Sequence, residues 1–459
     1  MSKKYTTPSS SSTDAKVLVD KKATAGKMEK IVSLCKRRGF IYPGSEIYGG
    51  LASTYDYGPL GAELKNNIKQ AWWKYFVQDR DDMVGLDGGI ISKAKIWEAS
   101  GHVKNFKDPL IECKKCHKRF RPDKLKDASK CPECGGDFTK ERQFSQLFKT
   151  FIGPVEDDQE MVYLRGETAQ NIFINFKNVL DSTNVKIPFG IGQMGKSFRN
   201  EITTGNFIFR TLEFEIMELE YFISPDANWK KLFKEWFDYI HKFTGVIGLD
   251  NKKLHDVEIP KEERAHYSKR TVDMYYEFPF GKDELWAIAY RTDYDLTNHQ
   301  KHSGQDLTYL DNKTKEKYIP HVIEPTFGVD RTVLAVLVEG YEEEKLDNGE
   351  TRVVLKLNHN MAPYKIAVFP LLKNKPKLVK LAKEIYNNLK TKFVCEFDDH
   401  GNIGKRYRRQ DEIGTPYCVT VDFDSLEKKD VTVRDRDSMK QERVKTDELE
   451  EYFNEKLVK

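Results

Sequence analysis

The chain has 459 residues, which is long enough for two to four domains. Its composition, with 39% hydrophobic and 32% charged residues, is typical of a soluble globular protein, and no run of eighteen apolar residues predicts a membrane span. The N-terminus lacks the apolar core of a secretory signal, and the net charge of +4 permits a nucleic-acid partner without arguing for one.

The seven cysteines argue against a disulfide framework. Their number is odd, and Cys35, Cys395 and Cys418 are scattered along the chain, whereas the other four lie in two close pairs. This distribution predicts a reducing compartment, and so a cytoplasmic location, together with a bound metal.

The N-terminal part of the chain divides into a tail and helices. Residues 1 to about 27 are rich in serine and lysine with few large apolar residues, which predicts a disordered tail. A helical pattern runs from Met28 to Arg38, and a stronger helix begins at Pro59. The apolar stripe of that second helix indicates either core or a subunit interface; it consists of Leu64, Ile68, Trp72, Trp73 and Phe76.

Two cysteine pairs predict a metal site. Cys113-x2-Cys116 and Cys131-x2-Cys134 would supply four soft thiolate ligands in a tetrahedron, which suits structural Zn2+. The alternative is four unrelated thiols. His117 is interpreted as a bystander because the four cysteines complete the ligand set.

Before the central segment, the strand-like residues 161–164 lead to Arg165 and Glu167, which alternate on one face, and a helix is predicted over 168–179. A surface salt bridge is the default interpretation of that pair.

The segment 198–221 reads as two strands joined by a turn at 203–206, with a β-prone run at 207–209 that resumes the second strand. Residues two apart in a strand share a face, so Arg199 would point the same way as Glu201, and Phe214 the same way as Glu218. An amphipathic hairpin with a solvated charged face stays open as the alternative.

Further elements follow along the chain. Residues 226–244 predict an amphipathic helix, 272–278 and 284–289 predict strands, and a helix begins near Arg291. In residues 320–339 a strand ends at Ile323, and Arg331 lies in the first turn of an apolar helix. A cation at a helix N-terminus opposes the helix dipole, which is more reasonable if an anion binds nearby.

The last hundred residues predict a small mixed α/β domain after a boundary near 341–362. The predicted strands are 365–369, 394–397, 417–423 and 431–435, the helices are 376–389 and 403–413, and a last helix begins near Lys445. Four cations and an aromatic residue in 405–409 indicate either a phosphate contact or a solvent-facing charge run.

Several of these segments together resemble a known family. Residues 198–201 with their hairpin, and 328–331 entering a helix, are similar to motifs two and three of class II aminoacyl-tRNA synthetases. Residues 44–50, 99–102, 165–170, 324–326 and 411–414, in this order, resemble the dimeric glycyl-tRNA synthetase family. The resemblance covers about residues 28 to 459.

The resemblance implies an α+β fold, with a class II synthetase-like antiparallel sheet flanked by helices. Residues 28–350 would form the catalytic domain, with a zinc-ribbon-like insertion at about 108–142, and residues 361–459 a mixed α/β anticodon-binding domain. The implied activity is activation of glycine by ATP to glycyl-adenylate and pyrophosphate, followed by transfer of glycine to the 3′ end of tRNA(Gly) by a homodimer.

The resemblance also assigns roles to single residues. Arg199 would bind the α-phosphate and Arg331 the γ-phosphate, and both count as catalytic because preorganised cations stabilise charge during phosphoryl chemistry. Phe214 would stack on adenine, Glu201 would meet the adenine amino group and Glu284 would ligate Mg2+.

Two sets of site residues follow from the same resemblance. The implied ATP-binding set is Arg199, Asn200, Glu201, Phe209, Arg210, Thr211, Leu212, Glu213, Phe214, Glu284, Leu285, Gly328, Val329, Asp330 and Arg331. The implied glycine-binding set is Arg121, Glu167, Phe214, Glu215, Ile216, Met217, Glu218, Glu324, Pro325, Thr326, Phe327 and Gly328. Glu167, Glu218 and Glu324 would bind the ammonium group and fill the space that a side chain needs, so that no editing domain is required.

Three positions depart from the usual family pattern. Gly166 stands where proline is common, Thr326 replaces a serine, and Leu212 replaces an arginine, which removes a cation from the hairpin. Two other hypotheses compete: another class II synthetase, such as the prolyl or threonyl type, and a non-enzymatic zinc-ribbon protein that binds nucleic acid. The three pocket carboxylates argue against the first, and the retained Arg199 and Arg331 argue against the second.

Overall fold

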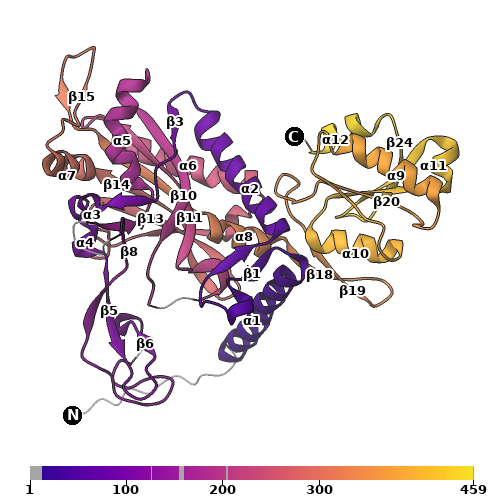
Figure 1. Cartoon of the computed structure of the whole chain (residues 1–459), viewed down its shortest axis with the longest axis horizontal. Helices are drawn as coiled ribbons and strands as arrows, with labels where there is room; N and C mark the ends of the chain where they lie inside the picture. The colour runs from indigo at the N-terminus through magenta and orange to yellow at the C-terminus, as the bar shows by residue number, and fades with distance from the viewer. Residues whose placement is uncertain (1–12, 126, 155–159, 203–204, 458–459) are drawn as a thin grey trace, which may run out of the picture.

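The computed structural model describes residues 13–125, 127–154, 160–202 and 205–457. Figure 1 shows a larger body that contains most of the chain and a smaller body formed by the C-terminal residues. Between them lies a hairpin of strands β18 (Tyr341–Lys345) and β19 (Thr351–Leu355), inside the predicted boundary region. Across the described residues, no helix combines the length and apolarity that a membrane crossing requires.

A mostly antiparallel sheet forms the centre of the larger body. As far as the chain is described, the sheet has seven strands in the order β12-β13-β14-β17-β11-β10-β3, and the β10–β3 pair is parallel. An antiparallel sheet covered by helices is the predicted α+β arrangement. The strands are β3 (Met83–Leu86), β10 (Phe189–Phe198), β11 (Glu213–Ile223), β12 (Leu254–Glu258), β13 (Arg270–Phe278), β14 (Gly281–Thr292) and β17 (His321–Gly328).

Strand β11 separates two chemical environments, because successive side chains of a strand point to opposite faces. Its odd-numbered residues from 217 to 223 belong to the main hydrophobic core. Its even-numbered residues begin with Phe214 and Ile216 and continue with the buried carboxyl groups of Glu218 and Glu220.

Helices α2 (Pro59–Trp73), α6 (Trp229–Ile247) and α8 (Val329–Gly340) contribute to the core on the odd-numbered face. The apolar stripe predicted on the helix after Pro59 lies in this core, and Trp72 and Phe76 are fully buried against Phe327 of β17, at ring-centroid distances of 5.9 and 4.9 Å. The core interpretation of the stripe is therefore confirmed.

Helices α5 (Ala169–Ser182) and α7 (Tyr294–Ser303) cover one end of the opposite face. Phe173 and Phe176 of α5 and Leu296 of α7 share a buried cluster with Phe222 of β11. The even-numbered side chains at the other end of β11 are left to a cavity described below.

The N-terminal helix is longer than predicted. Helix α1 (Thr13–Arg38) begins well before Met28, so the prediction of a disordered tail is wrong for residues 13–27, and residues 1–12 lie outside the described residues. The segment contains several alanines and lysines, which are strong helix formers. The prediction weighed the scarcity of apolar residues instead of this local propensity.

The loop of the central hairpin also differs from the prediction. Strands β10 and β11 pair as expected, from Phe189↔Phe222 to Phe198↔Glu213, but β10 ends at Phe198, so Arg199 and Glu201 lie in the loop. Residues Phe207–Phe209 form a short 3-10 helix, η4, because Ile208 and Phe209 are anchored in the core and tertiary packing overrides β propensity. Residues 203 and 204 of the predicted turn are outside the described residues.

Strand β17 continues past Ile323, where the prediction ends it, as far as Gly328. The prediction therefore left Glu324 and Pro325 outside the strand. In the structure Pro325 lies opposite Ile288 of β14 inside the sheet.

A small insertion carries the cysteine pairs. Strands β5 (Lys107–Glu112), β6 (Arg119–Phe120) and β7 (Arg142–Ser145) form its sheet, with β5 in the middle. Figure 1 shows this insertion extending away from the central sheet. A second small sheet is formed by strands from just before and just after the insertion in the sequence. Its strands are β4 (Ile91–Lys93), β8 (Lys149–Phe151) and β9 (Met161–Leu164).

The smaller body is the predicted mixed α/β domain. Its sheet order is β21-β20-β22-β23-β24, parallel over the first three strands and antiparallel over the last three. Strand β24 was missed in the sequence because it is mostly charged and exposed. The elements are β20 (Ile366–Pro370), α9 (Pro376–Leu389), β21 (Cys395–Phe397), α10 (Ile403–Ile413), β22 (Tyr417–Val421), α11 (Phe423–Lys428), β23 (Asp430–Asp435), β24 (Gln441–Lys445) and α12 (Leu449–Leu457).

Two of the four cations in the run 405–409 are committed to the fold. Arg406 is buried and donates hydrogen bonds to the main-chain oxygens of Pro370, Asp399 and Gly401, and Arg409 pairs with Asp398. These two residues are therefore not free for the phosphate contact that the sequence left open.

A buried ion network ties the hairpin to the smaller body. Asp411 of α10 accepts hydrogen bonds from Arg352 of β19 at 2.8 Å and from Arg434 of β23 at 2.9 and 3.2 Å. Arg352 and Asp411 are fully buried, and their charges are compensated within this network, in which Arg352 also pairs with Glu344 at 2.8 Å.

We predict that Asp411→Asn lowers the free energy of unfolding by about 3 kcal/mol, because it removes the carboxylate that two buried guanidinium groups share and leaves Arg352 with Glu344 alone as a charged partner. Chemical denaturation measures the change. Asp424→Asn, which breaks an exposed pair with Lys428, is the control and should change the free energy by about 0.5 kcal/mol or less. An equal effect of both substitutions would contradict the role given to Asp411.

Candidate active site and cysteine cluster

A cavity opens on the sheet face that carries Phe214 and Ile216. Arg199 reaches it from the loop after β10 and Arg331 from the first turn of α8, so both guanidinium groups line one cavity. Among the described residues that line it, only Ile208 is absent from the predicted sets. The others are Arg199, Glu201, Phe209, Arg210, Thr211, Phe214, Glu215, Ile216, Glu284, Leu285, Thr326, Gly328, Asp330 and Arg331.

Arg199 is anchored through the Nε atom of its side chain, and the residue lines the cavity. Its Nε donates to the main-chain oxygen of Gly166 at 3.1 Å, and its guanidinium carbon lies 5.3 Å from the ring centroid of Phe214. The departure at Gly166 therefore preserves this contact, because a carbonyl oxygen is the acceptor whichever side chain stands there.

Arg331 is held by Glu284 and by an aromatic ring. Its Nη1 donates to the main-chain oxygen of Glu284 at 2.8 Å and lies 3.1 Å from the carboxylate, and its guanidinium carbon is 4.5 Å from the ring centroid of Phe209. Burial opposes ionisation of Glu284, but Arg331 and then Arg199 hold the pKa of its carboxyl below the usual range. The carboxylate is therefore charged and suited to a metal cation.

Asp273 of β13 is a second carboxyl group near Glu284 that the sequence analysis missed. Burial and the neighbouring Glu284 raise the pKa of Asp273 to about 7, and Arg331 opposes that rise. Asp273 lies between the apolar residues Val272 and Met274 of β13, and this pattern gave no reason to assign it a function.

Asp330 lines the cavity but supports the protein around it. Its carboxylate accepts from the main-chain nitrogen of Glu215 at 2.7 Å and from Lys65 at 3.1 Å, and Tyr57 donates to it as well. Lys65 also lies 3.0 Å from the Glu215 carboxylate, which pairs with Lys69 too. These contacts couple α8 to β11 and α2.

Some predicted ATP-binding residues lie beside the cavity. Asn200 and Leu212 shape its rim through the main chain, since the Asn200 nitrogen donates to Gln146 at 2.8 Å and the Leu212 oxygen accepts from Arg199 at 2.9 Å. Glu213 is exposed and pairs with Lys196 instead.

Three other predicted residues point into the core on the opposite face, namely Met217, Phe327 and Val329. For Met217 and Phe327 the prediction took continuous runs of residues, whereas alternation along a strand gives only every second side chain to one face. Val329 begins helix α8 and packs into the core from there. These three can offer a ligand only main-chain atoms.

The predicted glycine-pocket carboxylates meet in a buried cluster next to the cavity. Thr326 connects the two, because it lines the cavity and donates from its hydroxyl to Glu218 at 3.1 Å. Thr168 donates to the other oxygen of Glu218 at 2.6 Å. Burial and then Glu167 raise the pKa of Glu218 above its usual range.

Arg291 is the buried cation of this cluster, and the sequence analysis did not assign it a role. It is fully buried, lies 2.6 Å from Glu324 and 3.9 Å from Glu167, and forms two hydrogen bonds of 2.8 and 2.9 Å with Asp295. The sequence offered one signal for this pairing. Arg291 lies near the end of a strand, four residues before the acidic Asp295.

Both carboxylate oxygens of Glu167 have side-chain partners, one from a histidine and one from a glutamine. His102 lies 3.1 Å from one carboxylate oxygen, and Gln170 donates to the other at 2.9 Å. Burial opposes ionisation, but His102 and Arg291 hold the pKa of Glu167 well below its usual range. His102 is part of the 99–102 motif, so its sequence context singled it out without giving its contact.

Two further predicted glycine-site residues, Arg121 and Pro325, belong neither to the cavity lining nor to the carboxylate cluster. Arg121 is held in the insertion by Asp108 and Asp123, each at 2.8 Å. Pro325 is buried in β17, one position away from Thr326 and on the alternate face.

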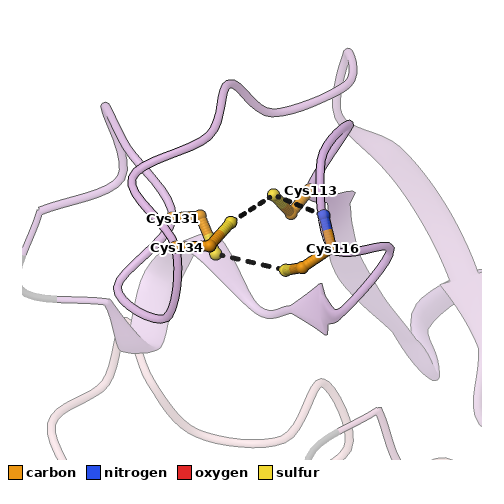
Figure 2. A group of neighbouring side chains, drawn as sticks. All are labelled: Cys113, Cys116, Cys131 and Cys134. Atoms are coloured by element: carbon orange, nitrogen blue, oxygen red, sulfur yellow. Dashed lines mark hydrogen bonds between the residues drawn. The ribbon is translucent and has the colours of Figure 1, made fainter.

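The four cysteines of the insertion converge on one point (Figure 2). The Sγ atoms of Cys113 and Cys134 are 3.4 Å apart and those of Cys116 and Cys131 are 3.7 Å apart. Four thiolates at zinc's usual bond length of about 2.3 Å would have sulfur–sulfur distances of about 3.8 Å, so the cluster fits tetrahedral Zn2+.

The surroundings of the cluster agree with four sulfur ligands. His117 points elsewhere, with Nδ1 3.5 Å from Glu112, as the bystander interpretation expects. A Cβ at Gly136 would approach Cys113 Sγ to 3.0 Å, so glycine leaves space beside that sulfur.

Comparison with known proteins gives the family. Residues 365–456 match the family model described as the anticodon binding domain. The chain is 53% identical to the glycine–tRNA ligase of Alkaliphilus oremlandii over 465 residues, 95% of this chain and 99% of the relative. It is 54% identical to that of Acetivibrio thermocellus over 462 residues, which is 94% and 98% of the two chains, and 53% identical to that of Clostridium acetobutylicum over 461 residues, again 94% and 98%.

An anticodon-binding domain beside an antiparallel sheet, with two arginines lining one cavity, defines an enzyme of the aminoacyl-tRNA synthetase class. The relatives narrow the class further, because their identity extends over nearly the whole chain. The chain belongs to the glycine–tRNA ligase family, as the sequence resemblance predicts.

We predict that Asp330→Asn lowers the melting temperature in the absence of any ligand, because the amide removes one of the two carboxylates that pair with Lys65 and weakens the acceptor for Tyr57 and the Glu215 main-chain nitrogen. Differential scanning calorimetry provides the measurement, and a loss of about 1–3 kcal/mol is expected for a buried charged partner. Asp347→Asn on the exposed loop is the control and should leave the transition unchanged. If Asp330 serves only to bind ATP, the unliganded protein will melt normally.

Proposed function

We propose that this chain is a glycine–tRNA ligase whose cavity holds ATP between Arg199 and Arg331, with glycine bound beside it next to the buried carboxylates. The observation that carries the proposal is that both guanidinium groups line one cavity and Thr326 joins that cavity to the acidic cluster. The amino acid would then lie between a cationic and an anionic region of one sheet face.

The chemistry proposed for the first step is attack of the glycine carboxylate on the α-phosphorus of ATP, with pyrophosphate leaving. No general base is needed, because the carboxylate is already ionised at neutral pH. Arg199 would stabilise the charge that develops on the α-phosphate, and Arg331 would hold the γ-phosphate. Glu284 would hold Mg2+, which when bound offsets phosphate charge.

The adenine end of ATP has a matching environment. Phe214 would stack on the base, and Glu201 would accept a hydrogen bond from its amino group. One carboxylate oxygen of Glu201 is buried and has no hydrogen-bond partner within the described part of the chain, although Arg210 lies 3.9 Å away. Arg210 also lines the cavity, so it supplies a cation near the position where Leu212 lacks one.

Glycine selectivity would come from crowding. Glu218, Glu324 and Thr326 occupy the space beyond the amino acid's α-carbon, and excluding a larger substrate by lack of room needs no editing site. Thr326 keeps the hydroxyl of the usual serine and uses it on Glu218.

The second step would transfer glycine to the 3′ end of tRNA(Gly), with the C-terminal domain reading the anticodon. We also propose the homodimer of the resemblance. Helix α2 buries its aromatic stripe, so the candidate surface is the exposed loop that carries Ile47, Tyr48 and Leu51, which are 88%, 87% and 58% exposed.

The four-cysteine cluster would hold one structural Zn2+ that stabilises the insertion. The donor set and sulfur spacing support this. All seven cysteines are free in the described residues, which agrees with the predicted reducing, cytoplasmic environment.

Two alternatives predict different behaviour. Another class II synthetase would activate proline or threonine, and a zinc-ribbon nucleic-acid-binding protein would activate no amino acid. We predict that the purified protein exchanges pyrophosphate into ATP with glycine alone, and equal exchange with serine, alanine, proline or threonine would reject the proposal.

We predict that Arg199→Ala reduces glycine-dependent pyrophosphate exchange by at least about a hundredfold while the melting temperature is kept, since one preorganised charge contact is worth about 3 kcal/mol in a transition state. Arg119→Ala, on the exposed surface of the insertion, is the matched control. Near-normal exchange by Arg199→Ala would contradict the role given to Arg199.

We predict one zinc per chain, bound by Cys113, Cys116, Cys131 and Cys134, and its removal with a chelator should increase proteolysis within residues 108–142. Elemental analysis of protein prepared without chelator measures the metal. Cys116→Ser should lose zinc, whereas Cys395→Ser should retain it. Metal-free protein with a protease-resistant insertion would contradict the prediction.

A further inference from the structure

Arg165 is a buried cation that none of the roles above uses. The default interpretation of its sequence was a surface salt bridge with Glu167. The structure shows that this interpretation is wrong, because Arg165 is only 2% exposed and Glu167 lies beside His102 and Arg291 instead. A buried charge without a counter-ion is costly, so a guanidinium group kept at this place calls for an anion that arrives from outside.

The other buried arginines of the described residues have their partners within the protein. Four of them pair with carboxylates, and the fifth, Arg406, donates from both outer nitrogens to main-chain oxygens. Arg165 donates from Nε to the oxygen of Lys196 and from Nη1 to the oxygen of Gly88, each at 2.7 Å, and Nη1 lies 3.4 Å from the side-chain oxygen of Asn171. Across the described chain, Arg165 forms no ion pair and its Nη2 meets no acceptor.

The free nitrogen lies on the sheet face that carries the cavity. A Cβ at Gly195 of β10 would lie 2.0 Å from Nη2 of Arg165, so the glycine leaves the space that the guanidinium group occupies. Gly195 pairs with Ile216 of β11, which lines the cavity. The neighbours of Ile216 on the same face are Phe214 and Glu218, so Nη2 lies between the proposed adenine contact and the carboxylate cluster.

Two more polar side chains on this face lack partners. Gln193 and Ser197 flank Gly195 along β10, and both are fully buried. The amide atoms of Gln193 and the hydroxyl of Ser197 have no hydrogen-bond partner within the described residues. An amide N–H, a guanidinium N–H and a hydroxyl therefore follow one another along the strand, and such a row of donors suits the oxygen atoms of a ligand.

We propose that Arg165 binds the α-carboxylate of the amino acid through Nη2. The inference rests on the proposed function, in which Arg199 and Arg331 are both assigned to phosphates and the substrate carboxylate has no cation of its own. One carboxylate oxygen attacks the α-phosphorus as the bond to pyrophosphate breaks, and Nη2 holds the other oxygen. The guanidinium group stays protonated, so it orients the attack without transferring a proton.

The acids near Arg165 do not offset its burial. Burial lowers the pKa of the guanidinium group below its usual range, although Asp87, Glu218 and Glu215 act in the opposite direction. Of these acids, Glu215 already pairs with two lysines. A carboxylate in hydrogen-bond contact with Nη2 supplies the missing compensation, since a charge-assisted hydrogen bond is stronger than a neutral one.

The test is Arg165→Gln in the full-length enzyme, assayed by pyrophosphate exchange. The amide lacks the charge, so KM for glycine should rise at least about tenfold while KM for ATP stays within about twofold. Arg165→Lys keeps the charge and should recover part of the loss. Arg142→Gln on the exposed surface of β7 is the matched control and should change neither value.

The hydrogen bonds to Lys196 and Gly88 also anchor the edge of β10, and the two KM values separate this structural role from substrate binding. If Arg165 only anchors the strand, Arg165→Gln will lower the melting temperature and either leave the glycine KM unchanged or raise both KM values together. Either outcome would overturn the proposal. A rise confined to the glycine KM supports it.

A second measurement needs no variant to fold. In a crystal structure of the wild-type enzyme with bound glycine, a carboxylate oxygen should lie within about 3.2 Å of Nη2 of Arg165. A carboxylate held elsewhere, out of hydrogen-bond reach of Nη2, would overturn the proposal. Absence of glycine-dependent exchange in the wild type would reject the proposed function itself, whereas normal exchange with either contrary result rejects this inference alone.

Discussion

The site depends on one constraint, the alternation of side chains along β11. Its odd-numbered residues are part of the apolar core with α2, α6 and α8, and its even-numbered residues change from aromatic and aliphatic to acidic along one face. A slip of one residue would exchange the two faces, so burial of the core fixes the register of the acids. The register with β17 then places Thr326 and Glu324 beside them.

Two regions of opposite excess charge lie next to each other along that face. The cavity has an excess of cations, and the carboxylate cluster has an excess of acids. Arg199, Arg210 and Arg331 line the cavity with Glu201 and Glu284, and the other two acids of the lining, Glu215 and Asp330, pair with Lys65 and Lys69. In the adjacent cluster, Arg291 is the cation shared among several carboxyl groups. Since charges in a dry interior demand partners, the proposed function would place phosphate in the first region and an ammonium group in the second. A zwitterion between them would then be oriented with its carboxylate toward the phosphates.

Much of this could be predicted from the sequence because local patterns carried it. The 3.6-residue periodicity after Pro59 and the boundaries of α9 and α10 follow from burial of one helix face. Arg331 was identified because a cation at a helix N-terminus is unusual without an anion. Arg199 was identified because it was expected to share a strand face with Glu201 and because its segment resembles a family motif. The cysteine spacing likewise requires only short-range geometry.

The features that could not be predicted from the sequence depend on contacts between segments that are far apart in the chain. Arg291 meets Glu324 only because β14 and β17 lie side by side in the sheet, and Asp330 supports the site only through its contacts with Tyr57 and Lys65. The short helix at Phe207–Phe209 forms because the core takes up two of its side chains. Met217 and Phe327 were assigned to the pocket because a run of residues was read without its alternation.

The most direct measurement of the central claim is a crystal structure with a non-hydrolysable glycyl-adenylate analogue. The account predicts that the group replacing the α-phosphate contacts Arg199, that the adenine lies on Phe214, and that the ammonium nitrogen lies beside the carboxylates of Glu218 and Glu324. An analogue bound with its ammonium group directed to solvent, or with Arg199 turned away from the linkage, would contradict it.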